Sequence, residues 1–390
     1  MYKIQTLNAI SDIIHDYLSA ENYLIAKEEP VPDGILVRSA DMHSMELPDS
    51  LLAIARAGAG TNNIPIAECT KRGIAVFNTP GANANAVAEL VICGLMLCSR
   101  NVAGGIEWVQ TELKDKGDEV AKLVEKGKKQ FVGPEVRGKT LSVIGLGAIG
   151  AIVANAAAQG LGMNAIGFDP FISVESAWSL SRSIKRYSNM DEAYAQADYL
   201  TLHVPLTDST KHMINADAIA KMKDGVHILN FSRGDLVDPQ AMIAALESGK
   251  VAGHVTDFPC AELIGVKNAI LIPHLGASTP ESEENCASMA AQEIRNYLEN
   301  GQIQNSVNLP EITLGYSEGS RVQIIHDNVP NMVSAISTAI SAKHININNM
   351  QNKSRKEVAV TVLELDTHPD DALIAELKAI PGIIRVRTFH

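Results

Sequence analysis

The chain has 390 residues, of which 46% are hydrophobic and 20% are charged, an ordinary composition for a globular protein of two or three domains. Its formal net charge of −12 argues against a general nucleic-acid-binding protein, because neutralising phosphates requires a basic surface. The first residues lack the apolar core of a signal peptide, and no apolar run approaches the roughly 20 residues of a membrane span, so we expect a cytoplasmic protein without membrane contact.

The first part of the chain predicts a small α/β domain. Five short apolar runs indicate strands at residues 2–7, 25–26, 34–38, 52–55 and 75–77. Their pattern favours a flavodoxin-like sheet without a nucleotide fingerprint. A later helix, residues 280–298, is expected to pack back onto this domain, so we assign residues 1–85 and 280–308 to substrate binding. The cleft between this domain and the next is the expected ligand site.

Residues 101–137 form a helical segment rich in lysine and glutamate around Trp108. The favoured interpretation is a solvated connecting helix. The alternative is a role in closing the cleft or in contacts between copies of the chain.

The clearest signal of function lies at residues 140–150, where a β-rich run leads directly into a Gly-x-Gly-x-x-Gly turn. The first glycine permits the tight turn, the second lets the backbone approach a pyrophosphate, and the third lets the next helix pack on the strand. The first N–H groups of that helix then face the phosphates. The residues expected to bind the cofactor here are Gly145, Gly147, Ala148, Ile149 and Gly150.

An acidic residue stands at the expected distance from this turn. Asp169 follows a second apolar strand, residues 164–168, and comes roughly 20 residues after the glycines. Its carboxylate can accept hydrogen bonds from a ribose diol, and it repels a 2′-phosphate. The sequence therefore predicts NAD rather than NADP as the cofactor.

The chain then continues as an alternation of strands and helices. Further strands are predicted at residues 199–204, 227–231, 253–256 and 269–272. Helices are predicted at 191–196, at 216–222, and from Asp238 and Pro239 to Ser248, where the aspartate supplies the N-cap and the proline the first helical position. This alternation is typical of a Rossmann-like, doubly wound parallel sheet, which we assign to residues 86–279.

Three side chains have the chemistry for hydride transfer from a 2-hydroxy acid, which needs a cation for the carboxylate and a base for the hydroxyl proton. Arg233 follows the carboxyl end of a strand and can hold a carboxylate bidentately. His274 follows the last strand, and a neutral imidazole is a natural proton acceptor. Glu262 lies between them and could bond the far ring nitrogen. Each also has a structural alternative: a surface ion pair, a packing histidine or a loop carboxylate.

The cysteine spacing indicates no metal centre. The five cysteines form neither a C-x-x-C pattern nor a cysteine and histidine ligand pattern, so we expect free thiols and no metal site. Cys260 is close to the candidate site in sequence but has no neighbouring base, and we do not expect it to be a nucleophile. His203, two residues before Pro205, is expected to shape the cofactor pocket rather than to transfer protons.

A segment containing proline, glycine and serine, residues 309–320, predicts a linker to a separate unit, residues 321–390. That unit is expected to contain strands at 321–328 and 383–389, helices at 330–343 and 370–380, and a hairpin of 345–350 and 357–365 that turns at 352–355. This βαββαβ order is the ferredoxin-like split motif. Such a sheet leaves an exposed edge, so we expect pairing with a second copy.

Several long motifs occur in order along nearly the whole chain: Ala57-Gly-Ala-Gly-Thr-Asn-Asn63, Asn78-Thr-Pro-Gly81, the glycine fingerprint, Leu202-His-Val-Pro-Leu206, residues 230–238 and Pro273-His-Leu-Gly276. On these motifs the chain resembles the D-specific 2-hydroxyacid dehydrogenases, and most closely those members that oxidise 3-phospho-D-glycerate to 3-phosphohydroxypyruvate in L-serine biosynthesis. The resemblance implies an NAD-dependent enzyme in which Arg233, Glu262 and His274 form the catalytic set.

The same resemblance implies further binding residues. The nicotinamide side of the cofactor is expected to contact Asp257 and the backbone of Phe231 and Ser232, with His203 and Pro205 also in the cofactor pocket. The set that looks suited to the phosphoglycerate anion is Arg38, Ser39, Asn83 and Arg233.

The C-terminal unit resembles an ACT regulatory domain, because its His326-Asp-Asn-Val-Pro330 segment matches the H-x-N-x-P segment of serine-regulated dehydrogenases. His326, Asn328 and Asn346 fall on the positions that bind L-serine in those enzymes. Two amides and an imidazole can satisfy the ammonium and carboxylate of an amino acid. The alternative is an ACT fold kept only for assembly, as part of a homodimer or homotetramer.

Two other functions stay open from the sequence. One is a D-2-hydroxyacid dehydrogenase with another substrate, which the regulatory unit argues against because most simple members lack one. The other is an NADH-sensing corepressor that binds protein partners. Retention of Arg233, Glu262 and His274 disfavours that second alternative.

Overall fold

The computed structural model describes residues 1–315 and 319–389, so residues 316–318 of the predicted linker and the final His390 lie outside the described part. The chain divides into two compact units. The first combines Met1–Asn83 with Glu283–His390, and the second is Ala84–Ser282.

The first unit contains a five-stranded parallel sheet. Its strands are β1 (Tyr2–Leu7), β2 (Tyr23–Ala26), β3 (Gly34–Val37), β4 (Ala53–Arg56) and β5 (Ala75–Asn78). They lie in the order β2-β1-β3-β4-β5, which is the flavodoxin-like order and confirms the predicted fold of this domain.

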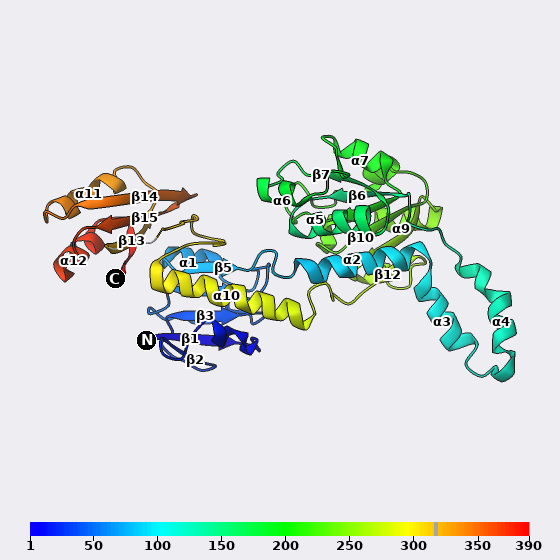
Figure 1. The fold of residues 1–390 in the computed structure, drawn as a ribbon, viewed down its shortest axis with the longest axis horizontal. Helices are drawn as coiled ribbons and strands as arrows, with labels where there is room; N and C mark the ends of the chain where they lie inside the picture. Colours follow the sequence, from blue (N-terminus) through cyan, green and yellow to red (C-terminus); the bar gives the residue numbers. More distant parts are fainter. Residues whose placement is uncertain (316–318, 390) are drawn as a thin grey trace. The chain divides into compact units, whose positions relative to one another are not determined.

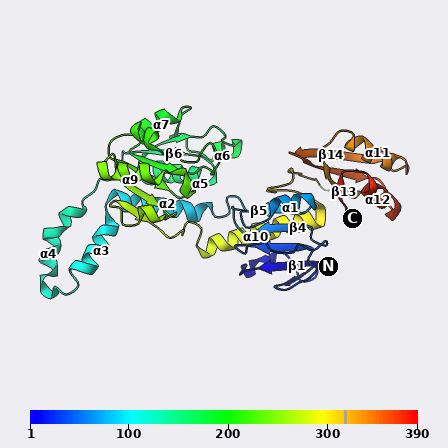
Figure 2. The ribbon, with the colours of Figure 1, turned by 180° about the vertical axis from the view of Figure 1, so that it is seen from behind.

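Both faces of this sheet are buried, because successive side chains of a strand point to opposite faces. Ile35 and Val37 join a cluster with Cys69 of α1 (Ile66–Lys71), whereas Leu36 joins a cluster with Ile294 of α10 (Pro280–Asn300). Both helices lie beside the five strands in Figures 1 and 2. The packing of α10 on this sheet confirms the expectation for residues 280–298.

The second unit contains a seven-stranded sheet in which all neighbouring strands are parallel. Its strands are β6 (Thr140–Ile144), β7 (Asn164–Phe168), β8 (Lys185–Arg186), β9 (Tyr199–Leu202), β10 (Val226–Asn230), β11 (Val251–Thr256) and β12 (Ala269–Leu271). The order β12-β11-β10-β9-β6-β7-β8 is that of a doubly wound Rossmann sheet, as predicted.

Helices cover both faces of this sheet. One apolar cluster contains side chains of α2 (Ala84–Ser99) and α5 (Ala148–Asn155), and the other contains side chains of α7 (Met190–Gln196), α8 (Ala216–Ala220) and α9 (Pro239–Ser248). A short helix, α6 (Val174–Ser179), follows β7. The carboxylate of Asp238 accepts the N–H groups of Gln240 and Ala241, which confirms the predicted N-cap of α9.

The lysine- and glutamate-rich segment forms α3 (Val102–Glu112), α4 (Val120–Gly127) and two short 3-10 turns, which extend away from the seven-stranded sheet (Figure 1). Neither helix has a buried side chain. Trp108 packs against Phe131 with ring centroids 5.4 Å apart, and Ile106 is 58% exposed. The segment is therefore solvated in one chain, and its exposed apolar side chains leave contacts with another copy open.

The C-terminal sheet is antiparallel, with α11 (Met332–Ser341) and α12 (Asp371–Ala379) packed on one face. Its strands are β13 (Ser320–Asp327), β14 (Ile347–Arg355), β15 (Val358–Leu365) and β16 (Ile383–Phe389). The order β14-β15-β13-β16 confirms the ferredoxin-like prediction. The predicted hairpin turn at 352–355 is wrong, because β14 continues to Arg355 and the left-handed Lys356, with a φ of 55°, makes the turn.

The other face of this sheet packs on the rest of the first unit. Val358, Val360 and Val362 share an apolar cluster with Leu309 and Ile312, which are fully buried. The start of the predicted linker is therefore core structure, because its two apolar side chains fill the space beneath the sheet.

Guanidinium groups on the C-terminal sheet reinforce this contact by donating to main-chain carbonyls. Arg385 donates to the carbonyls of Leu51 (2.7 Å) and Arg72 (3.0 Å), and Arg387 donates to those of Tyr297 (3.1 Å) and Leu298 (2.8 Å). Arg321 and Arg355 make bonds of the same kind to the carbonyls of Asn300 and Ser306.

Candidate active site

In the turn between β6 and α5, the space around each glycine agrees with the role predicted for that glycine. Gly145 has a φ of 91°, and a Cβ there would lie 2.4 Å from the carbonyl oxygen of His203. A Cβ on Gly150 would lie 1.9 Å from the carbonyl oxygen of Gly145, whereas a Cβ on Gly147 would meet nothing within 4 Å. Gly145 and Gly150 therefore have no room for a side chain, and the open space at Gly147 lets a phosphate approach the start of α5, where Ala148 and Ile149 lie.

Asp169 is fixed beside this turn at the end of β7. Its two carboxylate oxygens accept the N–H groups of Leu146 and Phe171, each at 2.8 Å. Each oxygen has a further lone pair that a ribose hydroxyl can use. The open glycine turn and the oriented carboxylate together fit a dinucleotide without a 2′-phosphate.

A cavity of about 470 Å³ lies at the carboxyl ends of β10 and β11. Its lining includes Asn230, Thr256, Asp257, Phe258, Cys260 and His274. This is the edge at which open α/β sheets bind ligands.

His274 stands at the wall of this cavity in a constrained backbone conformation. Its φ is 49°, and its N–H lies 3.1 Å from the carbonyl oxygen of Asp257 and 2.9 Å from that of Ile272. Its ring packs against that of Phe258, with centroids 4.7 Å apart. The backbone and the aromatic neighbour therefore hold an exposed imidazole at the end of the sheet.

Asp257 has one oxygen bonded and one unpartnered. Oδ2 accepts the N–H of Gly276 at 3.0 Å, whereas the buried Oδ1 has no hydrogen-bond partner among the described residues. Burial raises the pKa of Asp257, and the hydrogen bond from Gly276 and the proximity of His274 and Arg233 act in the opposite direction. An unpartnered buried acceptor fits the amide donor of a nicotinamide, and the shared electrostatics place Asp257, His274 and Arg233 in one local environment.

Arg233 precedes the 3-10 turn Gly234–Leu236 just beyond β10. Its side chain is exposed, and its Nη1 donates to the carbonyl of Ser232 at 2.6 Å. The side chain of Asn230 holds this loop, because its Nδ2 donates to the carbonyl of Arg233 and its Oδ1 accepts the N–H of Ser232. Phe231 is buried under α2, where a Cβ on Gly94 would come within 2.8 Å of its ring.

Glu262 lies in the 3-10 turn Ala261–Leu263 and is exposed. Its carboxylate lies near the Cys260 thiol and helps to raise the pKa of Cys260, after the larger effect of burial. No hydrogen bond joins Glu262 to His274 among the residues that the structure describes. The expected bond between acid and base is absent here, and the role of Glu262 stays a prediction.

His203 has the environment of a structural residue. Its Nε2 lies 3.0 Å from the Thr201 hydroxyl, and its Nδ1 is buried. Burial lowers the pKa of His203 to about 3, so the ring is neutral at physiological pH. The carbonyl of Pro205 accepts the hydroxyl of Thr210 and so holds the loop that follows β9.

The residues predicted to bind the phosphoglycerate anion lie in the first unit. Arg38, directly after β3, forms an ion pair of 2.7 Å with Glu283 at the start of α10. The N–H of Ser39 donates to Asn8, and Asn83 is half-buried just before α2. The proposed anion-binding guanidinium therefore already has a carboxylate partner.

Sequence reasoning missed Arg56. It ends β4 opposite Val37 of β3, and its Nε donates to the carbonyl of Arg38 at 3.0 Å. Two arginines thus lie together at the carboxyl edge of the five-stranded sheet. The signal was available, because Arg56 directly follows the strand predicted at 52–55, much as Arg38 ends the strand predicted at 34–38.

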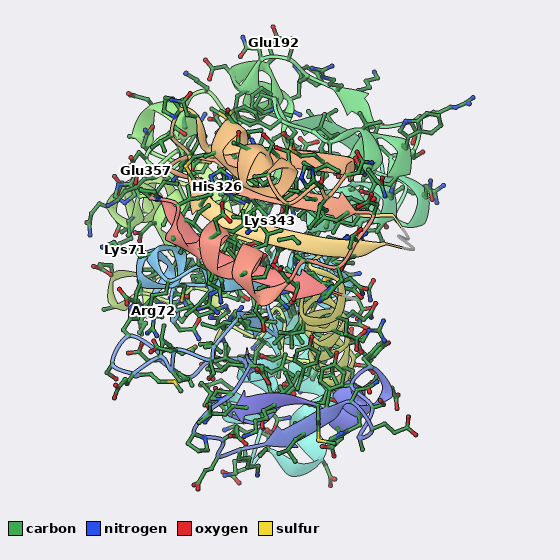
Figure 3. The ribbon with its side chains drawn as sticks, turned by 90° about the vertical axis from the view of Figure 1, so that its left-hand side faces the viewer. Lys71, Arg72, Glu192, His326, Lys343 and Glu357 are labelled. Atoms are coloured by element: carbon green, nitrogen blue, oxygen red, sulfur yellow. The ribbon has the colours of Figure 1, made fainter. Side chains whose placement is uncertain are left out.

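The three residues predicted to bind serine occupy two ends of the C-terminal sheet. His326, labelled in Figure 3, is opposite Ala359 in the β13–β15 pairing, and Asn328 donates to the carbonyl of Lys356 beside it. Asn346 precedes Ile347, which is opposite Leu365 at the far end of β15. These residues therefore do not form one site within a single chain.

His326 is also buried and already bonded. Its Nδ1 lies 2.7 Å from the carbonyl oxygen of Asp327, and its Nε2 lies 2.9 Å from the Thr361 hydroxyl. A ligand that uses this ring has to replace one of these bonds.

Two kinds of feature are absent from the described part of the chain. No group of three or more potential metal-binding side chains occurs there. No single helix there is long and apolar enough to cross a membrane, and only the sharply bent pair of α2 and α3, taken together, has that length and apolar composition.

Comparisons with known proteins agree with this geometry. The model of the D-isomer specific 2-hydroxyacid dehydrogenase NAD-binding domain matches residues 94–276. A D-3-phosphoglycerate dehydrogenase of Haemophilus influenzae is 32% identical over 358 residues, which cover 89% of this chain and 83% of that protein. A protein of the same name from Synechocystis is 36% identical over 293 residues, which cover 73% of this chain, and the match spans only 50% of that relative's length.

Solved structures show the same fold over most of the chain. A glyoxylate reductase from Paecilomyes thermophila aligns with a TM-score of 0.65 at 28% identity, covering 78% of this chain and 98% of that one. An NAD⁺-bound 3-phosphoglycerate dehydrogenase from Entamoeba histolytica aligns with a TM-score of 0.60 at 27% identity, covering 79% and 98%. On the glycine turn, the two parallel sheets and these matches, the chain belongs to the family of D-isomer specific 2-hydroxyacid dehydrogenases.

Proposed function

We propose that the protein is an NAD-dependent dehydrogenase that oxidises 3-phospho-D-glycerate to 3-phosphohydroxypyruvate, the first step of L-serine biosynthesis. The observation that carries this proposal is the match to the Haemophilus influenzae D-3-phosphoglycerate dehydrogenase over 83% of its length. The cavity at the end of the seven-stranded sheet supports it, because its walls carry the imidazole and the unpartnered carboxylate oxygen that such a reaction uses.

In this proposal the residues of the second unit carry out the chemistry. NAD⁺, when bound, supplies the acceptor for the hydride that leaves C2 of the substrate. His274 accepts the proton of the C2 hydroxyl as the carbonyl forms. Arg233 binds the substrate carboxylate and stabilises the charge that develops on the C2 oxygen.

Glu262 has a supporting role in the proposal. A carboxylate beside the far ring nitrogen of His274 would fix the tautomer and stabilise the imidazolium. Its carboxylate lies near the Cys260 thiol, so the side chain has to change conformation to reach the ring.

The phosphoryl group is assigned to the arginines of the first unit. Arg38 and Arg56 supply positive charge to an otherwise acidic protein, with Ser39 and Asn83 as additional hydrogen-bond donors. Glu283 competes with the phosphate for Arg38, because its carboxylate pairs with Nη2 of the guanidinium at 2.7 Å and offsets part of the positive charge.

The test is NADH oxidation by the purified chain, with 3-phosphohydroxypyruvate compared with hydroxypyruvate, which lacks the phosphate. We expect kcat/KM to be higher for the phosphorylated substrate by on the order of 10², since each charged hydrogen bond contributes ~1.5 to 3 kcal/mol. Arg38→Ala should remove most of this preference and leave the rate with hydroxypyruvate unchanged. Equal rates for both substrates in the wild type would assign the protein to another 2-hydroxy acid.

We also propose that the C-terminal sheet is an ACT regulatory domain that binds L-serine between two chains of a homodimer or homotetramer. The support is geometric: β14 is an edge strand, and His326 and Asn346 lie at opposite ends of the sheet. Antiparallel pairing of two such edges would bring His326 and Asn328 of one chain toward Asn346 of the other. Five free cysteines agree with a reducing, cytoplasmic location.

A further inference from the structure

A second cavity lies within the first unit. It has a volume of about 370 Å³ and is lined by Leu52, by Lys378 of α12 and by the five consecutive residues 383–387 of β16. β16 pairs with β13 on one side only, so the cavity follows an outer strand of the C-terminal sheet. Its walls therefore come from both the C-terminal sheet and the five-stranded domain.

Three of the lining residues are cations: Lys378, Arg385 and Arg387. None of them forms an ion pair with a carboxylate of the described residues. The nearby Asp49 is paired with Arg72 at 2.7 Å, and its side chain is fully exposed. In a chain with a net charge of −12, this leaves a local concentration of positive charge.

The two arginines are held in place by groups that carry no formal charge. Arg385 donates to the carbonyls of Leu51 and Arg72, and Arg387 lies over the ring of Tyr297 at 4.5 Å. Burial lowers the pKa of Arg385, and the charges of Arg387 and Arg72 act in the same direction. The carbonyl bonds use two of the five N–H groups of Arg385, so the guanidinium keeps donors for another acceptor.

The remaining walls of the cavity are apolar. They consist of Leu52, Ile383, Ile384 and Val386. A pocket with preorganised cations on one part and aliphatic side chains on the rest is suited to a small organic anion.

We propose that this cavity binds a phosphate or carboxylate group, with Lys378, Arg385 and Arg387 as its cationic partners and the apolar part of the ligand on Leu52 and the β16 isoleucines. Such a ligand touches the C-terminal sheet and the five-stranded domain at once. Its binding would therefore strengthen the contact between them. The inference does not depend on the catalytic assignment, because none of these residues belongs to the proposed catalytic set.

The test uses the full chain with Arg38→Ala as background, which removes the proposed contact between Arg38 and a bound anion. Inorganic phosphate and butyrate are titrated calorimetrically into this variant and into two double variants that add Lys378→Glu or Lys353→Glu. Lys353 is an exposed lysine of β14 and gives the same change in charge on another strand. We expect at least one probe to bind at one site per chain. Its affinity should be at least about tenfold weaker in the variant with Lys378→Glu and unchanged in the variant with Lys353→Glu.

Two results would overturn the proposal. One is the absence of binding by either probe in the Arg38→Ala background. The other is an equal loss of probe affinity in both lysine variants, which would indicate a general effect of net charge rather than binding in this cavity. Turnover with 3-phosphohydroxypyruvate tests the proposed function separately, so that failure of one proposal is distinguishable from failure of the other.

Discussion

The carboxyl group of Glu293 provides a quantitative test of the packing of the first unit. Glu293 lies on α10 and is 6% exposed. Its Oε1 accepts the Asn305 amide at 2.7 Å, and its Oε2 is buried with no partner among the described residues. Burial raises the pKa of Glu293 from 4.5 to about 8, the Asn305 bond opposing it, so the group is protonated in the folded protein at neutral pH.

The sign of the pH dependence follows from this raised pKa. The stability that the protonated Glu293 contributes is fully present below pH 4.5 and is lost as the pH rises toward 8. The reason is that Glu293 ionises at a lower pH in the unfolded chain than in the folded protein. At 1.36 kcal/mol for each pKa unit, the loss by pH 7 is roughly 3 kcal/mol. Glu293→Gln removes this titration and keeps an oxygen for Asn305. We therefore expect the variant to be more stable than the wild type at pH 7 by up to roughly 3 kcal/mol, with the difference shrinking toward pH 5.

The assay is urea unfolding followed by circular dichroism at pH 5, 6, 7 and 8. Glu284→Gln, an exposed change on the same helix, is the matched control and should leave the profile unchanged. Parallel stability profiles for the wild type and Glu293→Gln would show that the carboxyl ionises freely, and the argument from burial would be wrong.

Three further predictions concern the proposed sites. Asp169→Ala should weaken the binding of NAD and lower the ratio of kcat/KM with NAD to kcat/KM with NADP, because one carboxylate both binds the ribose and repels a 2′-phosphate. An unchanged ratio would contradict this role. His274→Ala should lower turnover by ~10² to 10⁴ while NADH binding, measured by fluorescence titration, persists; near-normal turnover would remove His274 as the base. Asn346→Ala should abolish serine inhibition and calorimetric serine binding without changing the uninhibited rate, with a coupling of about 1 to 3 kcal/mol in the wild type; equal serine binding by the two proteins would exclude that site.

The sheet topologies were predictable from the sequence because each rests on a repeated local pattern. Apolar runs separated by helical segments predict parallel sheets, and one strong glycine turn with Asp169 beyond it identifies the nucleotide-binding one. The hairpin turn was harder to predict. Lys356 adopts a left-handed conformation that no glycine or asparagine marks.

The candidate site was predictable as a set of residues but not as a set of contacts. Arg233 and His274 follow strand ends, and that position alone brings them to one edge of the sheet. The position of the Glu262 side chain was not predictable, because local contacts in a loop, here near the Cys260 thiol, set the conformation of a side chain and sequence spacing does not. Arg38 was identified, yet its ion pair with Glu283 joins residues far apart in sequence.

The arginines beneath the C-terminal sheet contact carbonyl oxygens, which every residue type possesses. Arg385 and Arg387 bond the main chain at Leu51, Arg72, Tyr297 and Leu298, and none of these bonds depends on the side chain of the acceptor residue. Evolutionary change of the side chains of Leu51, Arg72 and Leu298 therefore leaves the bonds intact, as long as the backbone path is kept, whereas a change of Tyr297 also removes the ring over which Arg387 lies. Loss of an arginine, by contrast, removes both of its bonds in a single substitution. Among homologues, the arginines of this contact should vary more slowly than the residues that they bind.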